Sequence, residues 1–203
     1  MKTLIIVDFQ YDFCNPNGTL YVPGAEEAEE AIVKHINSDE EIGEVVFTLD
    51  WHPINHCSFK INGGEWPTHC LQYSQGAGIS QKIMNACLDQ GIPVKFFLKG
   101  DLYNVEEYAA FIHSTHYPFS YLLQGVKQTA FVNQSGSSYI RFENKEIEVC
   151  GLAGDYCVRE TIDAINGKKP IEKLSVFMDG IKSIDGGKTF NEFLNEHPEI
   201  KKV

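Results

Sequence analysis

The sequence has no long apolar run and few basic residues. No stretch approaches the roughly 18 to 20 apolar residues that a membrane-spanning helix needs. The N-terminus reaches Asp8 before the apolar core of a signal peptide could develop. Lys and Arg number 17 against 28 Asp and Glu, which gives a formal net charge of −11. Nucleic acids and anionic membranes bind clustered cations, so we expect neither as a partner. We expect a cytoplasmic protein with a small-molecule substrate.

Common cofactor and redox motifs are also missing. The sequence contains no glycine-rich dinucleotide fingerprint and no P-loop. None of its six cysteines has the C-x-x-C spacing of thiol-redox proteins. Without a secretory signal, these cysteines are expected to be free thiols. With 43% hydrophobic residues, residues 1–203 are long enough to bury a core, and we expect one domain.

Apolar runs of strand length alternate with segments of helical periodicity. This alternation is typical of an α/β fold with a mostly parallel sheet, in which ligands gather at the carboxyl ends of the strands. The segment 115–137 is ambiguous, and the tail after Gly180 carries little pattern. The periodicity predicts strands at 3–9, 44–50, 92–100, 138–142, 145–153 and 173–180, and helices at 24–37, 78–91, 106–114, 118–129 and 161–167.

Three side chains at expected strand ends could form a nucleophilic site. Cys157 lies between an apolar strand and the start of a helix, where unpaired backbone N–H groups favour a thiolate. A cysteine nucleophile needs a base and a group that holds the base, and Asp8 and Lys99 are available. Such a lysine would lower the pKa of the thiol and keep Asp8 negative. Taken singly, each residue has an ordinary alternative, as a buried apolar cysteine or a solvated charge.

A second group of residues indicates a metal site. Asp50 and His52 follow a strand, and His69 returns after a turn-rich segment. One carboxylate and two imidazoles suit a divalent metal that keeps open positions for water or substrate. Two alternatives remain open: a structural zinc held by Cys57, Cys70 and two histidines, and simple loop polarity.

Aromatic side chains flank both groups of polar residues. Phe13 and Trp66 lie close to them in the sequence, and Tyr108 follows Lys99 by nine residues. Flat apolar walls with a few polar groups form a pocket for a planar ring. For each aromatic residue taken alone, core packing is the alternative.

Five segments together resemble a known family. DFQYDF, TLDWHPINHCSF, WPTHC, LKG and GLAGDYCV stand in the order, and near the spacing, of the nicotinamidases (pyrazinamidases) within the isochorismatase-like cysteine hydrolases. They run from the first residues to about residue 180. The resemblance implies a three-layer α/β sandwich with a mainly parallel six-stranded sheet and helices on both faces.

The resemblance also implies roles for individual residues. Asp8, Lys99 and Cys157 match the catalytic triad of the family, and Asp50, His52 and His69 match its metal ligands. His56 matches a histidine that ligates metal in some members only, so its role stays open. Zinc is the first expectation for the metal, with iron and manganese as alternatives.

Two further features follow from the same resemblance. The peptide between Leu152 and Ala153 is expected to be cis and to aim the Ala153 N–H, with that of Cys157, at an oxyanion. The residues expected to enclose the pyridine ring of the substrate are Phe13, Trp66 and Tyr108.

The implied activity is hydrolysis of nicotinamide, and of pyrazinamide, to the acid and ammonia through a cysteine thioester, in NAD salvage. The nearest alternative is a related hydrolase acting on another small amide or carbamoyl compound. A non-catalytic binding protein and a thiol-redox protein are further alternatives. The sequence does not decide whether the chain forms a homo-oligomer.

Overall fold

The computed structural model describes the chain except residues 112–130, 134, 136, 143 and 168–170. A six-stranded sheet forms its centre, and every neighbouring pair of strands in it is parallel. In spatial order the strands are β3 (Val94–Lys99), β2 (Ile42–Asp50), β1 (Lys2–Val7), β6 (Glu146–Gly151), β7 (Lys173–Ile181) and β8 (Lys201–Lys202). The expected α/β fold is therefore confirmed.

Five α-helices and three shorter features complete the described part of the chain. The helices are α1 (Tyr11–Cys14), α2 (Ala25–Ser38), α3 (Gln81–Asp89), α4 (Arg159–Ile165) and α5 (Lys188–Glu196). The shorter features are the 3₁₀ turn η1 (Lys60–Asn62), the π-helical turn η3 (Gly154–Val158), and a hairpin of β4 (Phe131–Val132) and β5 (Tyr139–Ile140).

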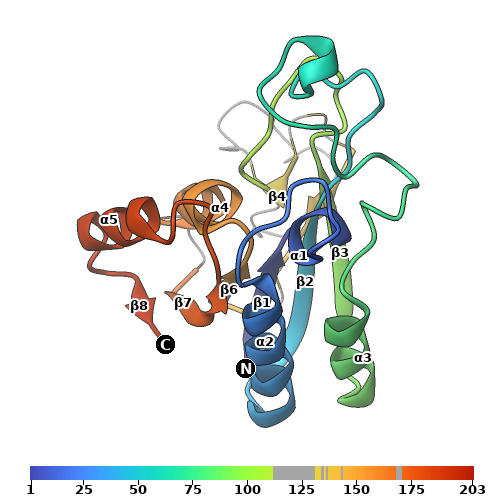
Figure 1. Cartoon of the computed structure of the whole chain (residues 1–203). Coiled ribbons are helices and arrows are strands. Elements are labelled where there is room, and N and C mark those ends of the chain that lie inside the picture. Colours follow the sequence, from blue (N-terminus) through green and yellow to red (C-terminus); the bar gives the residue numbers. More distant parts are fainter. Residues whose placement is uncertain (112–130, 134, 136, 143, 168–170) are drawn as a thin grey trace, which may run out of the picture.

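The chain moves in opposite directions across the sheet on either side of the β1–β6 pair. From β1 it proceeds to β2 and β3, and from β6 it proceeds to β7 and β8. Right-handed crossovers then place α2 and α3 on one face and α4 and α5 on the other. The reversal point between β1 and β6 is where open α/β sheets bind ligands. The loops that follow β2 lie beyond this carboxyl edge, at the top of Figure 1.

Of the strands and helices expected from the sequence, two need correction and a third lies outside the described residues. Residues 139–140 form a strand, but it pairs with β4 outside the main sheet, and the sixth strand is the unexpected β8. Residues 106–111 are not helical. There the backbone carbonyl of Glu107 accepts from Lys99, and its carboxylate accepts from the Gly100 N–H, so the segment is tied to the end of β3 instead. The helix expected at 118–129 lies outside the described residues.

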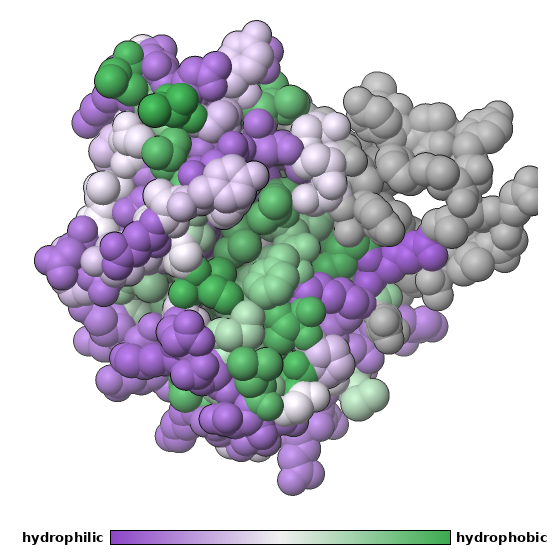
Figure 2. Space-filling view, turned by 90° about the vertical axis from the view of Figure 1, so that its right-hand side faces the viewer, coloured by the Kyte–Doolittle hydropathy of each residue, from purple (hydrophilic) through white to green (hydrophobic). Residues whose placement is uncertain are grey.

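The core is built around β1, which is covered on both faces. Leu4, Ile5, Ile6 and Val7 have no exposed surface, as expected for an apolar strand in the middle of a parallel sheet. At the β3 edge the cover is thinner. Phe96 is half exposed there, and Figure 2 shows apolar side chains gathered on this side of the molecule. None of the helices in the described part of the chain is long and apolar enough to span a bilayer.

The central position of β1 predicts a large difference between two isoleucine truncations. Ile6→Ala removes buried methyl groups where neighbours cannot collapse, so it should lower the free energy of unfolding by about 2–5 kcal/mol. Ile61→Ala, on an exposed turn, should change it by less than about 0.5 kcal/mol. Urea unfolding of both variants measures the difference. Equal destabilisation would contradict the assigned core.

Candidate active site

Four strand ends deliver the polar side chains of the site. Asp8 follows β1, Asp50 ends β2 and Lys99 ends β3. Cys157 lies in the turn η3, which follows β6 after a short link. Because these strands are parallel neighbours, residues far apart in the sequence meet at one edge. The side chains are all buried.

Lys99 is the centre of this group. Its ammonium lies 2.9 Å from the Asp8 carboxylate and 3.5 Å from the Cys157 sulfur, and it donates a hydrogen bond to the Asp50 carboxylate. It also donates to the Glu107 carbonyl at 3.2 Å. The three residues expected as a triad are thus brought together. Asp50, expected only as a metal ligand, contacts the same ammonium.

Mutual attraction keeps the charges of Lys99 and Asp50. Burial alone would lower the pKa of Lys99, but the carboxylates of Asp50 and Asp8 raise it well above its usual value. Burial alone would raise the pKa of Asp50, but Lys99 and His52 hold it below its usual range. The lysine is therefore cationic and Asp50 anionic at neutral pH.

Asp8 is the carboxylate whose protonation is most easily changed. Burial raises its pKa above the ordinary value, and Asp50 adds to that effect while Lys99 opposes it. The Thr48 hydroxyl donates to Asp8 Oδ1 at 2.9 Å, which favours the ionised form. The backbone of Asp8 has φ 47°, a left-handed conformation that is uncommon outside glycine. Asp8 can therefore exchange a proton with a neighbouring group.

Cys157 rests as a thiol, contrary to the expected thiolate. Burial raises the pKa of its thiol well above the usual value; Lys99 opposes this, while Asp8 and Asp50 reinforce it. Lys99 does lower the pKa of the thiol, as the sequence suggested, but burial and the carboxylates of Asp8 and Asp50 raise that pKa by more. A sulfur nucleophile here needs a base at the moment of attack, and a carboxylate oxygen of Asp8 lies within 4.8 Å.

The turn that holds Cys157 is tightly fixed. The peptide between Leu152 and Ala153 is cis, as expected. The Gly154 N–H donates to the Lys182 carbonyl, and a Cβ at position 154 would lie 2.3 Å from the Ser183 hydroxyl oxygen. The buried Asp155 carboxylate accepts from the N–H groups of residues 184 and 185 at 3.1 and 3.0 Å. Among the described residues, none accepts a hydrogen bond from the Ala153 N–H.

Asp50, His52 and His69 offer three donor atoms within 4.8 Å of one another. Nδ1 of His52 donates to the Gly100 carbonyl at 2.8 Å, and Nδ1 of His69 donates to the Pro67 carbonyl at 2.7 Å. In the neutral rings both Nε2 atoms therefore carry lone pairs, and they lie 3.4 and 3.7 Å from Asp50 Oδ2. His52 Nε2 is buried without a hydrogen-bond partner. Imidazoles oriented through backbone carbonyls are typical of metal ligands, so the residues fit a divalent metal.

His56 lies beside this set, but both of its ring nitrogens have other partners. Its ring stacks on His52 at 4.0 Å. Nε2 donates to the Val105 carbonyl at 2.9 Å, and Nδ1 accepts from the Ser58 hydroxyl at 2.6 Å. Burial lowers its pKa to about 4, so the ring is neutral. His56 therefore lies beside these donors, and with His52 and Glu106 it also forms a group of side chains that could hold a metal ion.

The structural-zinc alternative has no geometric support in the described residues. No group of three or more clustered metal-binding side chains there contains Cys57 or Cys70. Every cysteine is a free thiol, as expected.

A pocket opens above Cys157 and is lined mostly by apolar side chains. The three expected aromatic residues line it, and the Trp66 indole donates to the Tyr108 hydroxyl at 2.9 Å. Tyr156 packs edge-on against Trp66, with ring centroids 5.2 Å apart. Its full lining is Phe13, Leu20, Val22, Asp50, Trp66, His69, Glu106, Tyr108, Ala153, Tyr156, Cys157 and Ile184. Two of the possible metal ligands, Asp50 and His69, thus line the same pocket as Cys157, and its remaining walls are largely flat and apolar.

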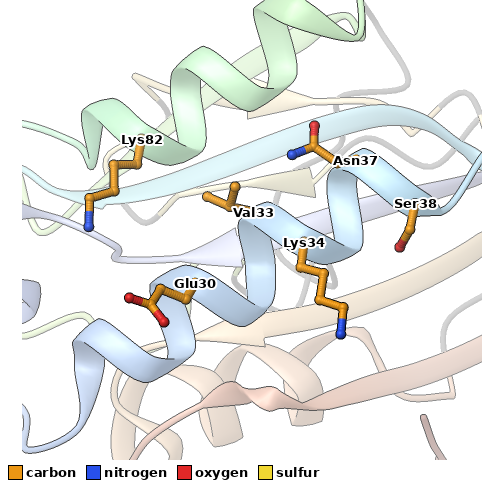
Figure 3. Close-up of a pocket in the computed structure, with 6 residues that line it drawn as sticks. All are labelled: Glu30, Val33, Lys34, Asn37, Ser38 and Lys82. Carbon is orange, nitrogen blue, oxygen red and sulfur yellow. The ribbon is translucent and has the colours of Figure 1, made fainter.

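A second hollow lies between α2 and α3, away from these residues (Figure 3). Its polar side chains, among them Glu30, Lys34 and Lys82, do not converge on one point in Figure 3. Lys82 is instead paired with Glu29 at 2.7 Å. This hollow offers no chemistry comparable to that around Lys99.

Sequence reasoning missed several members of the site. Tyr156 immediately precedes Cys157, and this adjacency was a usable signal. Thr48 lies inside a buried strand and Glu107 in a segment expected to be helical, so their contacts with Asp8 and Lys99 depend on the fold. Ile184 reaches the pocket from the tail, where the sequence has little pattern.

Known proteins resemble this chain in sequence and in fold. No family model matches the chain. The nicotinamidase of Saccharomyces cerevisiae is 29% identical over 91% of this chain and 89% of its own length.

Solved structures give the same result. The yeast nicotinamidase bound to the inhibitor nicotinaldehyde has a TM-score of 0.75 at 27% identity, covering 100% of this chain and 99% of that one. The pyrazinamidase of Pyrococcus horikoshii in complex with zinc has a TM-score of 0.67 at 29% identity, covering 100% and 98%. The resemblance indicated by the motifs is thereby confirmed: in sequence and in fold, this chain is similar to nicotinamidases and pyrazinamidases.

Proposed function

We propose that residues 1–203, as one domain, hydrolyse nicotinamide to nicotinate and ammonia in NAD salvage, and that pyrazinamide reacts in the same way. The observation that carries this proposal is the buried ammonium of Lys99 between Asp8, Asp50 and Cys157, of which Asp50 and Cys157 line an aromatic pocket. The names of the relatives support the choice of substrate.

A divalent metal would be held by Asp50, His52 and His69. We propose zinc, supported by the zinc complex of the P. horikoshii protein, with iron and manganese as alternatives for this ligand set. Such a metal would supply a Lewis acid for the ring nitrogen of the substrate. Phe13 and Trp66 would then face the ring and place the carboxamide over Cys157.

The chemistry begins with a proton transfer from Cys157 to Asp8. The thiolate attacks the amide carbon, and the N–H groups of Ala153 and Cys157 receive the oxyanion, which contributes a few kcal/mol. Protonated Asp8 donates its proton to the departing nitrogen, and ammonia leaves a thioester. Asp8 then takes a proton from water, the hydroxide attacks the thioester, and the acid departs as the thiol re-forms. Lys99 keeps Asp8 in place throughout.

Cys157→Ala should abolish ammonia release from nicotinamide, because the thioester cannot form. Cys87→Ala, a matched change of a buried free thiol in α3 that does not line the pocket, should keep most of the activity. An enzyme-coupled ammonia assay with nicotinamide, pyrazinamide and a ureido compound measures both variants. Turnover of the ureido compound alone would favour the related hydrolase of another amide or carbamoyl compound.

The rate should depend on the ionisation of Asp8. As the pH falls through its raised pKa, the base becomes protonated and kcat/KM should fall. Thr48→Val removes a hydrogen bond to the ionised form, so the acid limb should move upward by roughly one pH unit. Thr3→Val is the control, since Thr3 donates to the buried Glu44 at 2.9 Å at the other end of the sheet. Equal shifts of the acid limb in Thr48→Val and Thr3→Val would argue against Asp8 as the base.

The two stacked histidines, His52 and His56, should differ in how much each contributes to metal affinity. His52→Ala removes an unpartnered donor atom and should weaken zinc affinity by at least about 100-fold, whereas His56→Ala should weaken it about tenfold or less. Metal content after dialysis measures this. Chelation should leave the circular dichroism spectrum unchanged, because strand ends hold the site. Unfolding on chelation would instead indicate a structural metal.

A further inference from the structure

Gln10 is a fully buried amide that the proposed mechanism does not use. Its side-chain oxygen accepts from the Asp50 N–H at 2.8 Å, and its side-chain nitrogen donates to the Asp50 carbonyl at 2.8 Å. The second hydrogen of that nitrogen has the Ala77 carbonyl as its partner, at 3.0 Å. One side chain therefore forms hydrogen bonds with both the N–H and the carbonyl of Asp50.

The backbone of Gln10 is tied to the other carboxylate of the site. Its N–H donates to the Asp8 carbonyl at 2.8 Å, and Asp8 itself has the left-handed φ of 47°. The Asp8 N–H donates in turn to the Thr48 carbonyl on β2 at 3.0 Å. Gln10 thus contacts both residues whose carboxylates share the Lys99 ammonium: its side chain binds the backbone of Asp50, and its own N–H binds the backbone of Asp8.

Only an amide of this length can make these contacts together. A carboxylate would direct oxygen at the carbonyls of Asp50 and Ala77, and a methionine would leave three buried polar groups without partners. An asparagine is one methylene shorter. The site thus requires both the donor and the acceptor of Gln10, whereas apolar packing would need only its volume.

We propose that Gln10 is a positioning residue that fixes the Asp50 peptide, so that one carboxylate oxygen faces Lys99 and the other faces the metal. The metal part of this inference rests on the proposed function. Asp50 Oδ1 already meets Lys99, and Oδ2 faces Nε2 of both metal-binding histidines. A rotation of the Asp50 peptide would move both oxygens at once.

Gln72 provides a matched control within the same segment. Its side-chain nitrogen donates to the carbonyl of Trp51, the residue next to Asp50, at 2.9 Å. It is a glutamine bound to the same stretch of backbone, yet it touches neither polar group of Asp50. A general role in holding residues 50–52 would make the two glutamines equivalent.

The experiment compares Gln10→Met with Gln72→Met in the substrate-free protein. Calorimetric titration with Co²⁺ gives the metal affinity, and thermal unfolding of the metal-free form gives the stability. We expect Gln10→Met to weaken Co²⁺ binding about 10- to 100-fold and Gln72→Met less than about threefold. In nicotinamide hydrolysis, Gln10→Met should lower kcat more than it raises KM. If Gln10→Met does not fold, Gln10→Asn, which keeps a buried amide, is measured against the same expectation.

Equal Co²⁺ affinities of the two methionine variants, or of Gln10→Asn and the wild type, would overturn the proposal. Absence of Co²⁺ binding by the wild type would overturn it as well. Failure of the wild type to release ammonia from nicotinamide would remove the proposed function alone, because the affinity comparison uses no substrate.

Discussion

The site depends on one buried ammonium. Lys99 has no exposed surface and is surrounded by two carboxylates, a thiol and a backbone carbonyl. A buried charge is stable only when partners with good geometry replace water. Without this cation, the carboxylates of Asp8 and Asp50 would repel each other in a region of low dielectric. Lys99 therefore holds the side chains of Asp8, Asp50 and Cys157 together.

The parallel sheet explains how these groups meet. Neighbouring strands run in the same direction, so their carboxyl ends form one edge, and the reversal between β1 and β6 leaves space above it. Asp8, Asp50 and Lys99 are placed by three adjacent strands, and Cys157 by the turn after the fourth. The positions of these side chains are set by rigid elements, which is how precise sites are generally built. Loops supply two of the aromatic walls, Trp66 and Tyr108, whereas Phe13 lies in α1 and Tyr156 in η3.

The sequence predicts the parts of this molecule that depend on local pattern. Apolar runs ending in a charged residue predict β1, β2 and β3 together with the polar group at the end of each. Contacts between residues that only the folded chain brings together are not predicted from the sequence. The 106–111 segment has helical periodicity, but there the Glu107 carbonyl accepts from Lys99 and the Glu107 carboxylate accepts from the Gly100 N–H instead. The strand β8 has two residues, too few for any periodicity. The resting state of Cys157 depends on the burial of its sulfur, which no sequence pattern encodes.

The protonated state of Cys157 also affects how the protein meets reactive chemicals. Alkylating agents and peroxides attack the thiolate, and a thiol whose pKa is raised by burial presents almost none of it. Cys157 as a residue is only 7% exposed, which further limits access. Burial thus shields the Cys157 sulfur from irreversible oxidation for as long as it stays protonated.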